Sequence, residues 1–291
     1  MIDLHTHTRF SDGTDSPTVL IAKALAAGIT TLGITDHDTT AGWAEAKESL
    51  PGGMELVLGS EISALTPDGV SVHIVALLFD PAAPALTSLF SHTQDSRNYR
   101  MKKMIEKLST AGYAITWEEV MLELREEGTL GRPHLADAMI KKGYFLNRDE
   151  AFSQVLSNNS PYFVSHSAPT PAEIVKLVAA AGGVSIIAHP LASLRGRTLD
   201  LTSLAELIEA GLDGVEVDHR DHSDAERKVL REFLHQWRNG SEKQVGVFGS
   251  SDYHGNGKLN LLGENTTDPD EWEWLQEIAY QRSQERRVVQ R

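Results

Sequence analysis

The sequence predicts an α/β protein built on a parallel sheet or barrel that carries a helical insert. Three observations lead to this fold class. Short β-branched or apolar runs alternate with helical patterns, seven of these runs are strand candidates, and the alternation stops once for a long helical stretch. Repeated strand–helix units favour parallel pairing. A chain of 291 residues, 41% of them hydrophobic, is large enough for a core domain with an insert.

The expected strands and helices of the core domain follow one another along the chain. Helical patterns at residues 17–27, 41–50 and 201–210 each end at a glycine-containing turn, which is a common helix stop. Short runs rich in apolar and β-branched residues, typical of buried strands, lie before and after these helices. The seven expected strands are residues 2–8, 30–35, 55–61, 70–79, 184–188, 214–217 and 245–249.

A helical insert is expected at residues 83–165, where the strand signal disappears. Thr116 and Glu119 fit a capping box, in which the hydroxyl and the carboxylate satisfy free N–H groups at a helix start. We therefore predict a discontinuous barrel domain, residues 1–82 and 166–291, and an insert that covers the active site. The helical patterns of the insert are residues 97–111, 116–127, 133–142 and 148–156.

Composition excludes several classes of protein. Cysteine is absent, so disulfides, thiolate zinc sites and cysteine nucleophiles are excluded, and any metal ion must use His, Asp and Glu. With 27 Lys and Arg against 41 Asp and Glu, the formal charge of −14 opposes binding to a long polyanion. The chain opens without a basic and apolar leader, and no apolar run approaches a membrane span. We expect a cytoplasmic protein that needs no membrane, long nucleic acid or obligate protein partner.

Histidines and acidic residues gather at the ends of the expected strands. His5 and His7 are separated by one residue, so on an extended strand both imidazoles point to the same face. Parallel α/β folds place active sites at the C-terminal edge of their strands. Burying nine such side chains together is costly unless they pair with one another, and metal coordination would satisfy all of them at once. The nine are His5, His7, Asp12, His37, Glu61, His73, His189, Asp252 and His254.

The motifs around these residues resemble those of the PHP (polymerase and histidinol phosphatase) family. The stretches LHTHTRFSDG, ITDHDT, AHP and SDYH, together with Glu61 and His73, look like successive PHP motifs, in order, across nearly the whole chain. The resemblance implies a distorted seven-stranded (βα)7 barrel with an α-helical insert domain. It also implies a metal-dependent phosphoesterase with up to three metal ions at the C-terminal edge of the barrel.

The resemblance further implies how the ligands are shared among two to three divalent ions. The three groups are His5, His7, Glu61 and Asp252; Glu61, His73 and His189; and Asp12, His37 and His254. Glu61 bridges the first two ions, and Asp12 stands where some members have His. Imidazole and carboxylate ligands without sulfur favour Mn²⁺, Fe²⁺ or Zn²⁺. A metal-bound hydroxide held by Glu61, Asp252 and His189 is the expected nucleophile.

A substrate phosphate needs donors as well as metal ions. Arg132 and His134 open a helix of the insert, where free N–H groups, a guanidinium and an imidazole can hold an anion. This element resembles one in the PHP subgroup that removes the 3′-phosphate from nucleoside 3′,5′-bisphosphates and trims short oligonucleotides from the 5′ end. In that subgroup the element helps to hold the 5′-phosphate, so the expected substrate is a small nucleotide.

Further contacts with the substrate are expected from loops of the barrel. Arg197 could reach the other phosphate, and Arg195 is a weaker candidate. His166 and His222 are candidates to line the pocket, although they and His219 fit equally well as surface histidines. The general acid is not identified by the sequence.

Three alternatives remain open. Histidinol phosphate is another substrate of PHP members, although the element at Arg132 and His134 favours a nucleotide. An amidohydrolase barrel also begins with a strand His-x-His, but it usually adds a carboxylated Lys on a central strand, and no expected strand offers one. A non-catalytic PHP binding module is the third alternative, and the complete ligand set argues against it.

Overall fold

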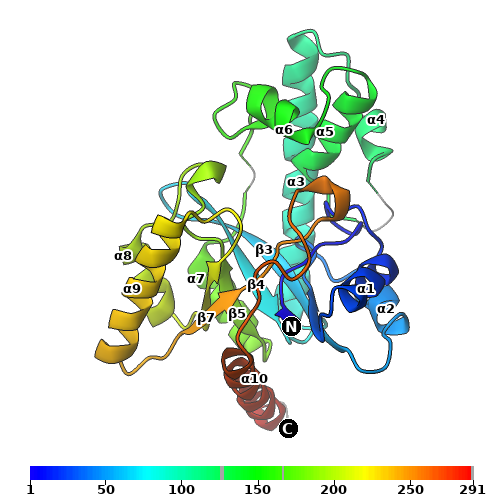
Figure 1. Ribbon diagram of the computed structural model, residues 1–291. Coiled ribbons are helices and arrows are strands. Elements are labelled where there is room, and N and C mark those ends of the chain that lie inside the picture. Colours follow the sequence, from blue (N-terminus) through cyan, green and yellow to red (C-terminus); the bar gives the residue numbers. More distant parts are fainter. Residues whose placement is uncertain (125–127, 166, 290–291) are drawn as a thin grey trace.

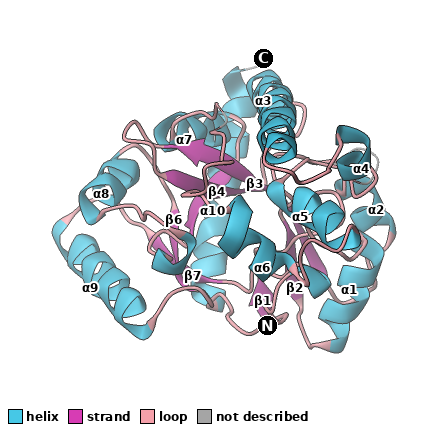
Figure 2. Ribbon diagram, turned by 90° about the horizontal axis from the view of Figure 1, so that it is seen from above, coloured by secondary structure: helices cyan, strands magenta, loops and turns pink. Residues whose placement is uncertain are grey.

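Seven strands form one sheet surrounded by helices, in the order β1-β2-β3-β4-β5-β6-β7 (Figures 1 and 2). The computed structural model describes residues 1–124, 128–165 and 167–289. The strands are β1 Ile2–Asp3, β2 Thr31–Ile34, β3 Glu55–Leu65, β4 Ser71–Leu77, β5 Val184–Ala188, β6 Gly214–Asp218 and β7 Gly246–Gly249. The seven-stranded α/β fold predicted from the sequence is confirmed.

The sheet curves into a nearly closed barrel. Residues that follow β1 and β7 pair across the gap, through a parallel bridge between Thr6 and Tyr253. The Asp252 N–H also donates to the His5 carbonyl at 3.0 Å. Regular β1 ends at Asp3, earlier than the expected end at residue 8, but these bonds keep the following segment in the barrel wall.

The expectation of uniformly parallel strands is wrong at β4, which runs antiparallel to both β3 and β5. The connection from β3 to β4 is a tight turn in which the Val70 N–H donates to the Thr66 hydroxyl at 2.8 Å and Gly69 has φ +86°. Such a turn is too short for the helical crossover that parallel strands require. The remaining neighbours pair in parallel, and β3 continues past its expected end at Glu61 as far as Leu65.

Helices cover the outside of the barrel, and a second group forms the insert. Glu119 N–H donates to the Thr116 hydroxyl at 3.2 Å and Thr116 N–H to the Glu119 carboxylate at 2.9 Å, which confirms the expected capping box. The barrel helices are α1 Pro17–Ala26, α2 Trp43–Glu48, α7 Pro171–Ala180, α8 Leu201–Glu209, α9 Asp224–Gly240 and α10 Pro269–Val289. The insert contains α3 Pro84–Thr110, α4 Trp117–Met121, α5 Arg132–Lys141, α6 Arg148–Ala151 and a π-helical turn, Phe152–Leu156.

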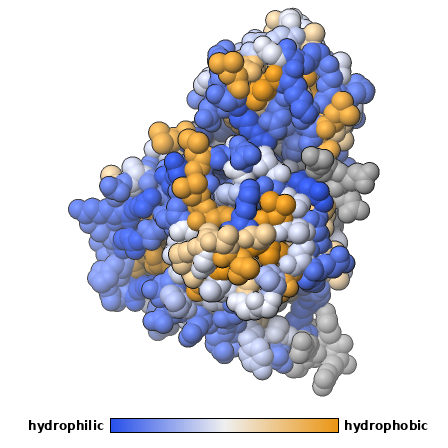
Figure 3. Space-filling view, turned by 45° about the vertical axis from the view of Figure 1, so that its right-hand side comes forward, coloured by the Kyte–Doolittle hydropathy of each residue, from blue (hydrophilic) through white to orange (hydrophobic). Residues whose placement is uncertain are grey.

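Two hydrophobic cores are joined by α3, which rises from the barrel into the insert (Figure 1). Leu86 and Phe90 at its start pack in the barrel core, whereas Met101 and Met104 near its end pack in the core of the insert. This packing explains why α3 begins before the expected residue 97. In Figure 3 the insert forms an upper lobe above the barrel. None of the helices in the described ranges is both long and apolar enough to span a membrane.

Candidate metal centre

All nine expected ligands lie at one edge of the barrel. Seven follow the C-terminal ends of β1, β2, β5 and β7 or lie in the loops just beyond, and Glu61 lies within β3. His73 differs, because it lies near the start of β4, opposite Ser63 of β3 and Ala188 of β5. Since β4 is antiparallel to both neighbours, its N-terminal end reaches the same edge as their functional ends. The reversal of β4 thus places His73 with the other ligands.

Four ligand atoms converge in the first group. The Nε2 atoms of His5 and His7 lie 3.0 Å apart, and each is 3.0–3.2 Å from Oε2 of Glu61. Oδ1 of Asp252 lies 3.3 Å from Nε2 of His7 and 3.5 Å from that of His5. Ligands bonded tetrahedrally at about 2.0–2.2 Å stand about 3.3–3.6 Å apart, so these side chains fit around one ion with small adjustments.

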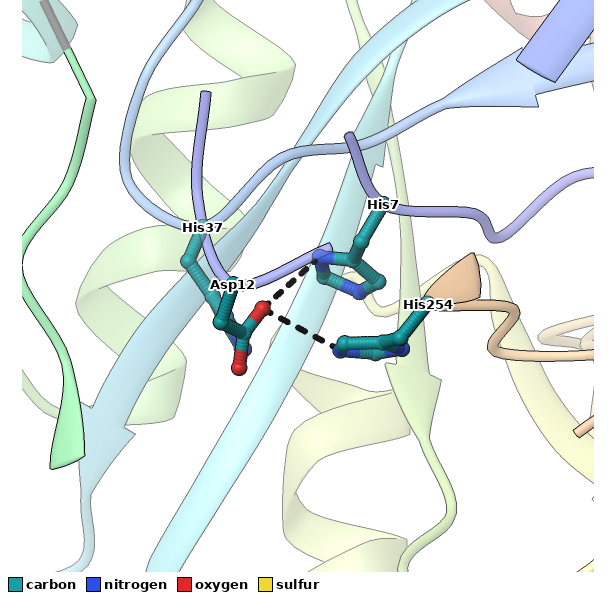
Figure 4. A group of neighbouring side chains, drawn as sticks. All are labelled: His7, Asp12, His37 and His254. Atoms are coloured by element: carbon teal, nitrogen blue, oxygen red, sulfur yellow. Dashed lines mark ion pairs between the residues drawn. The ribbon is translucent and has the colours of Figure 1, made fainter. Parts of the chain in front are cut away.

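A second cluster forms around Asp12 (Figure 4). His254 Nε2 lies 3.1 Å from Oδ1 of Asp12, and His7 Nδ1 lies 3.7 Å from the same oxygen. His37 completes the group, with Nε2 3.9 Å from Oδ2 of Asp12. The group contains the three residues that the PHP resemblance implied and adds His7, whose ring thus faces two clusters.

Glu61 joins the remaining imidazoles. Its Oε2 faces His5 and His7, and its Oε1 lies 2.8 Å from His73 Nδ1 and 3.2 Å from His189 Nε2. His37 Nδ1 is 3.2 Å from Oε2, so His37, Glu61 and His73 form the third compact group. The two oxygens of one carboxylate therefore face different sets of imidazoles, which is the geometry that a bridging ligand needs.

Several buried atoms of this cluster make no well-directed hydrogen bond among the described residues, although some lie close to another expected ligand. They have no access to water, so leaving them unpaired costs free energy. A divalent cation would satisfy the oxygen and nitrogen lone pairs together. The unpaired atoms of the expected ligands are Asp12 Oδ1, His37 Nδ1, His73 Nδ1, Asp252 Oδ1 and His254 Nε2.

Electrostatics prepares most of these groups for metal binding. Burial lowers the pKa of His37 to about 3 and that of His254 to about 4. Burial would raise the pKa of Glu61, but the surrounding histidines outweigh it and hold that pKa well below its ordinary value. For His7, hydrogen bonds to Asp252 and Glu61 outweigh burial and raise the pKa to about 9. Neutral imidazoles and ionised carboxylates are the forms that bind metal ions.

Backbone strain is concentrated at the same edge. His189 has φ +33° and Asp252 has φ +52°, in the left-handed region that residues other than glycine rarely adopt. Asp38, next to His37, has φ +51°. Such strain persists where surrounding contacts impose it, and it occurs often at functional sites.

Strand β6 and the residue that follows it supply two buried side chains, Glu216 and His219, that were not among the expected ligands. Glu216 is 2% exposed and its Oε1 lies 3.1 Å from His5 Nδ1. His219 is fully buried, with Nε2 3.4 Å from Oδ2 of Asp252, so of the two possibilities left open by the sequence the surface histidine is excluded. A charged residue in the run Gly214–Asp218, between two buried valines, was the available signal for Glu216.

The two candidate arginines of the barrel have different environments. Arg195 lies against the cluster, with Nη2 2.6 Å from Asp252 Oδ2 and Nη1 2.9 Å from His189 Nε2. Arg197 is 64% exposed and pairs with Asp68 at 2.6 Å. The weaker of the two candidates from the sequence is therefore the one that contacts the expected ligands.

The other candidate substrate contacts lie around the insert and the loop after β6. Arg132 donates from Nη1 to the Leu156 carbonyl and to Asn158, both at 2.7 Å. His134 is buried, and its Nδ1 accepts the Gly131 N–H at 3.0 Å as a helix cap.

The remaining expected substrate contacts are two histidines, His222 and His166. His222 is buried: its Nε2 accepts the Leu191 N–H at 3.1 Å and its Nδ1 donates to the Val217 carbonyl at 2.9 Å. Both ring nitrogens are thus occupied by the backbone, which contradicts the expected substrate contact. His166 lies outside the described residues.

The barrel, its convergent imidazoles and carboxylates, and their unpaired buried atoms define a hydrolase centre suited to divalent metal ions. A family model described as the PHP domain matches residues 3–147, and the chain belongs to the PHP family. It is 34% identical to a 3′,5′-nucleoside bisphosphate phosphatase from Chromobacterium violaceum, over 88% of each chain. It is 32% identical to a 5′-3′ exoribonuclease from Haemophilus influenzae, over 87% of this chain and 89% of the relative.

Solved structures agree with this assignment. A candidate metal-dependent phosphoesterase from Bifidobacterium adolescentis is 39% identical, covers 95% of both chains and superposes with a TM-score of 0.89. A Chromobacterium violaceum protein described as an amidohydrolase is 30% identical, with a TM-score of 0.82 over 95% of this chain and 96% of its own. None of the seven strands of the present chain contains a lysine, so they do not offer the carboxylated lysine that amidohydrolase barrels usually carry on a central strand. The protein is a metal-dependent phosphoesterase of the PHP family, a hydrolase of phosphoric esters.

Proposed function

We propose that the protein hydrolyses a phosphomonoester of a small nucleotide, namely the 3′-phosphate of nucleoside 3′,5′-bisphosphates, and also acts on short 5′-phosphorylated oligonucleotides. The observation that carries the proposal is a pair of half-buried cationic side chains, Arg132 and Arg148, in the part of the insert that contacts the loop carrying Asp12. Thr129 N–H donates to the Phe10 carbonyl at 2.9 Å, and Arg148 donates to the Asp12 carbonyl at 3.1 Å. The relatives named as a bisphosphate phosphatase and an exoribonuclease support it.

Arg132 has the properties of a 5′-phosphate contact. Burial and the nearby charge of Arg97 lower its pKa to about 10, so it remains a cation at pH 7. Its hydrogen bonds to protein in the described ranges go to neutral oxygens, and no described carboxylate is within ion-pair distance. A half-buried cation whose described partners are neutral oxygens gains from a charge-assisted hydrogen bond to a phosphate. His134 can donate from Nε2, because its Nδ1 accepts a backbone N–H.

Arg195 and Lys258 are suited to the phosphoryl group that is removed. Both contact the same oxygen of Asp252, at 2.6 Å and 2.9 Å, while the other oxygen faces His5 and His7. A metal ion on that other oxygen would share the charge of Asp252, leaving the two cations to attract a phosphate. Arg195 is in turn held by Asp221 at 2.5 Å. This assigns to Arg195 the role that the sequence suggested for Arg197.

The clustered histidines and carboxylates at the barrel edge are proposed to hold two or three ions of Mn²⁺, Fe²⁺ or Zn²⁺, since these ligands are imidazoles and carboxylates without sulfur. Bound divalent ions would polarise the phosphoryl oxygens and lower the pKa of a water molecule towards about 7. Glu61, Asp252 and His189 would help to hold that water.

The negative charge of −14 supports a small substrate over a long nucleic acid, and the absence of cysteine suits a cytoplasmic enzyme. No obligate protein partner is proposed.

The test is phosphate release by metal-stripped enzyme reconstituted with Mn²⁺, with the nucleoside products identified. Adenosine 3′,5′-bisphosphate should yield phosphate and 5′-AMP, and 5′-AMP itself should be inert. 3′-AMP should react more slowly because it lacks the 5′-phosphate. Preferred hydrolysis of histidinol phosphate, or release of the 5′-phosphate from the bisphosphate, would contradict the proposed substrate.

A further inference from the structure

Glu216 lies behind the candidate metal ligands and contacts the side of His5 that faces away from them. His5 Nε2 points to His7, Glu61 and Asp252, whereas His5 Nδ1 lies 3.1 Å from Glu216 Oε1. Glu216 is 2% exposed and belongs to none of the three ligand groups. Its carboxylate is therefore placed to accept a hydrogen bond from the N–H of His5 Nδ1.

The same carboxylate holds two other strands. Its Oε2 accepts the His189 N–H at 2.8 Å, at the residue with the strained φ of +33°. Its Oε1 accepts the Ser250 hydroxyl, two residues before Asp252. One side chain of β6 thus connects the ends of β1, β5 and β7, each of which carries an expected ligand.

We propose that Glu216 is a positioning residue of the metal centre. By accepting from Nδ1 of His5, it fixes the tautomer that leaves the lone pair of Nε2 free for an ion, and it sets the orientation of the ring. A carboxylate in this position also makes the imidazole a stronger donor to the metal ion. The inference rests on the metal centre of the proposed function and not on the identity of the substrate.

The substitution Glu216→Gln tests this with almost no change in volume. Three donors, from His5, His189 and Ser250, contact the two oxygens of Glu216. An amide has one oxygen, so its NH₂ group must face either His5 or the His189 N–H. If the NH₂ group faced His5, it would favour the tautomer with the proton on Nε2. A protonated Nε2 has no free lone pair and cannot bind a metal ion.

The matched control is Asp213→Asn, just before β6 at its opposite end. Asp213 is also buried, at 5% exposure, and its carboxylate pairs with Arg282 at 2.7 Å, away from the expected ligands. Both variants remove one buried carboxylate charge near the same strand. A general loss of stability would affect both, whereas an effect on metal binding should be confined to Glu216→Gln.

The readout is a stepwise titration of metal-stripped protein with Zn²⁺ against a chromophoric chelator, without substrate. Glu216→Gln should weaken one binding step by about 10- to 100-fold, the range found when partners of metal-bound histidines are lost. Asp213→Asn should leave every step unchanged. Unchanged steps in Glu216→Gln, or equal losses in both variants, would overturn the proposal. Failure to hydrolyse the proposed nucleotides would not affect this titration.

A second measurement uses the wild-type protein and therefore does not require a variant to fold. In metal-free wild-type protein, the imidazole ¹⁵N resonances of His5 should report a proton on Nδ1. A proton on Nε2 alone would show that Glu216 does not set the tautomer, and would overturn the proposal.

Discussion

At the residue scale, several side chains of the site contact different groups through their two polar atoms. The two oxygens of Glu61 face different imidazoles, and the two oxygens of Asp252 face the ligand cluster on one side and Arg195 with Lys258 on the other. The two ring nitrogens of His5 also face different groups, with Nδ1 next to Glu216 and Nε2 next to His7. Removing one of these side chains therefore affects more than one contact.

Arg132→Ala should raise the KM for adenosine 3′,5′-bisphosphate by roughly 10- to 100-fold, because a hydrogen bond to a charged group contributes about 1.5–3 kcal/mol. The KM for 3′-AMP should change little, since that substrate lacks the 5′-phosphate. Steady-state kinetics of both substrates provides the measurement. Arg197→Ala, which removes an exposed side chain paired with Asp68, is the comparison. Equal losses on the two substrates would remove Arg132 from the 5′-phosphate pocket.

The convergence of the nine expected ligands at one edge of the barrel could be predicted, because they are histidines and acidic residues at or near strand ends. Glu216 was not predicted, although it lies on an expected strand, because its sequence neighbours do not reveal which side chain it will contact. His222 shows the converse: a histidine near the site whose nitrogens are both bonded to the backbone. Such partners come from distant segments and become visible only in the folded chain.

At the element scale, the strand positions followed from apolar runs, whereas the direction of β4 did not. Direction depends on the connection, and Pro67-Asp68-Gly69 between β3 and β4 is a turn sequence that favours a hairpin. The first two strands also approach very closely. A Cβ atom built on Gly33 would lie 2.2 Å from the carbonyl oxygen of Leu4, the residue before His5.

Gly33→Ala should lower the free energy of unfolding by about 1–3 kcal/mol, because an added methyl group would force β1 and β2 apart. It should also weaken metal binding, because His5 follows Leu4 directly. Gly52→Ala is the control, since a Cβ there meets no atom within 4 Å. Urea unfolding of the metal-free proteins measures the difference. Equal stability of the two variants would show that the backbones can separate without cost.

At the scale of the whole molecule, α3 fastens the insert to the barrel. Arg97 on this helix is buried and donates to Asp38 at 2.6 Å and 2.9 Å and to Ser63 at 2.7 Å, all from the barrel. It also donates to the Leu130 carbonyl of the insert at 3.3 Å. Asp38 follows the expected ligand His37, so the same contact connects the insert with the metal centre.

Arg97→Ala should lower the free energy of unfolding by about 3–5 kcal/mol, because it leaves the carboxylate of Asp38 buried without its cation. Lys103→Ala, which removes an exposed ion pair with Glu106 on the same helix, should have little effect. Urea unfolding gives both values. Adding Asp38→Asn to Arg97→Ala should recover part of the loss. A loss no larger than that of Lys103→Ala would mean that the pair does not join the two parts.

The central claim is that the strand-end cluster is a metal centre in which Glu61 serves more than one ion. The most direct test is the metal content of purified wild-type protein, Glu61→Ala and His254→Ala after reconstitution with Mn²⁺ and gel filtration, with circular dichroism to check folding. We expect two or three equivalents in wild type, the loss of at most one in His254→Ala, and a larger loss in Glu61→Ala. Wild-type metal content in folded Glu61→Ala would contradict the account.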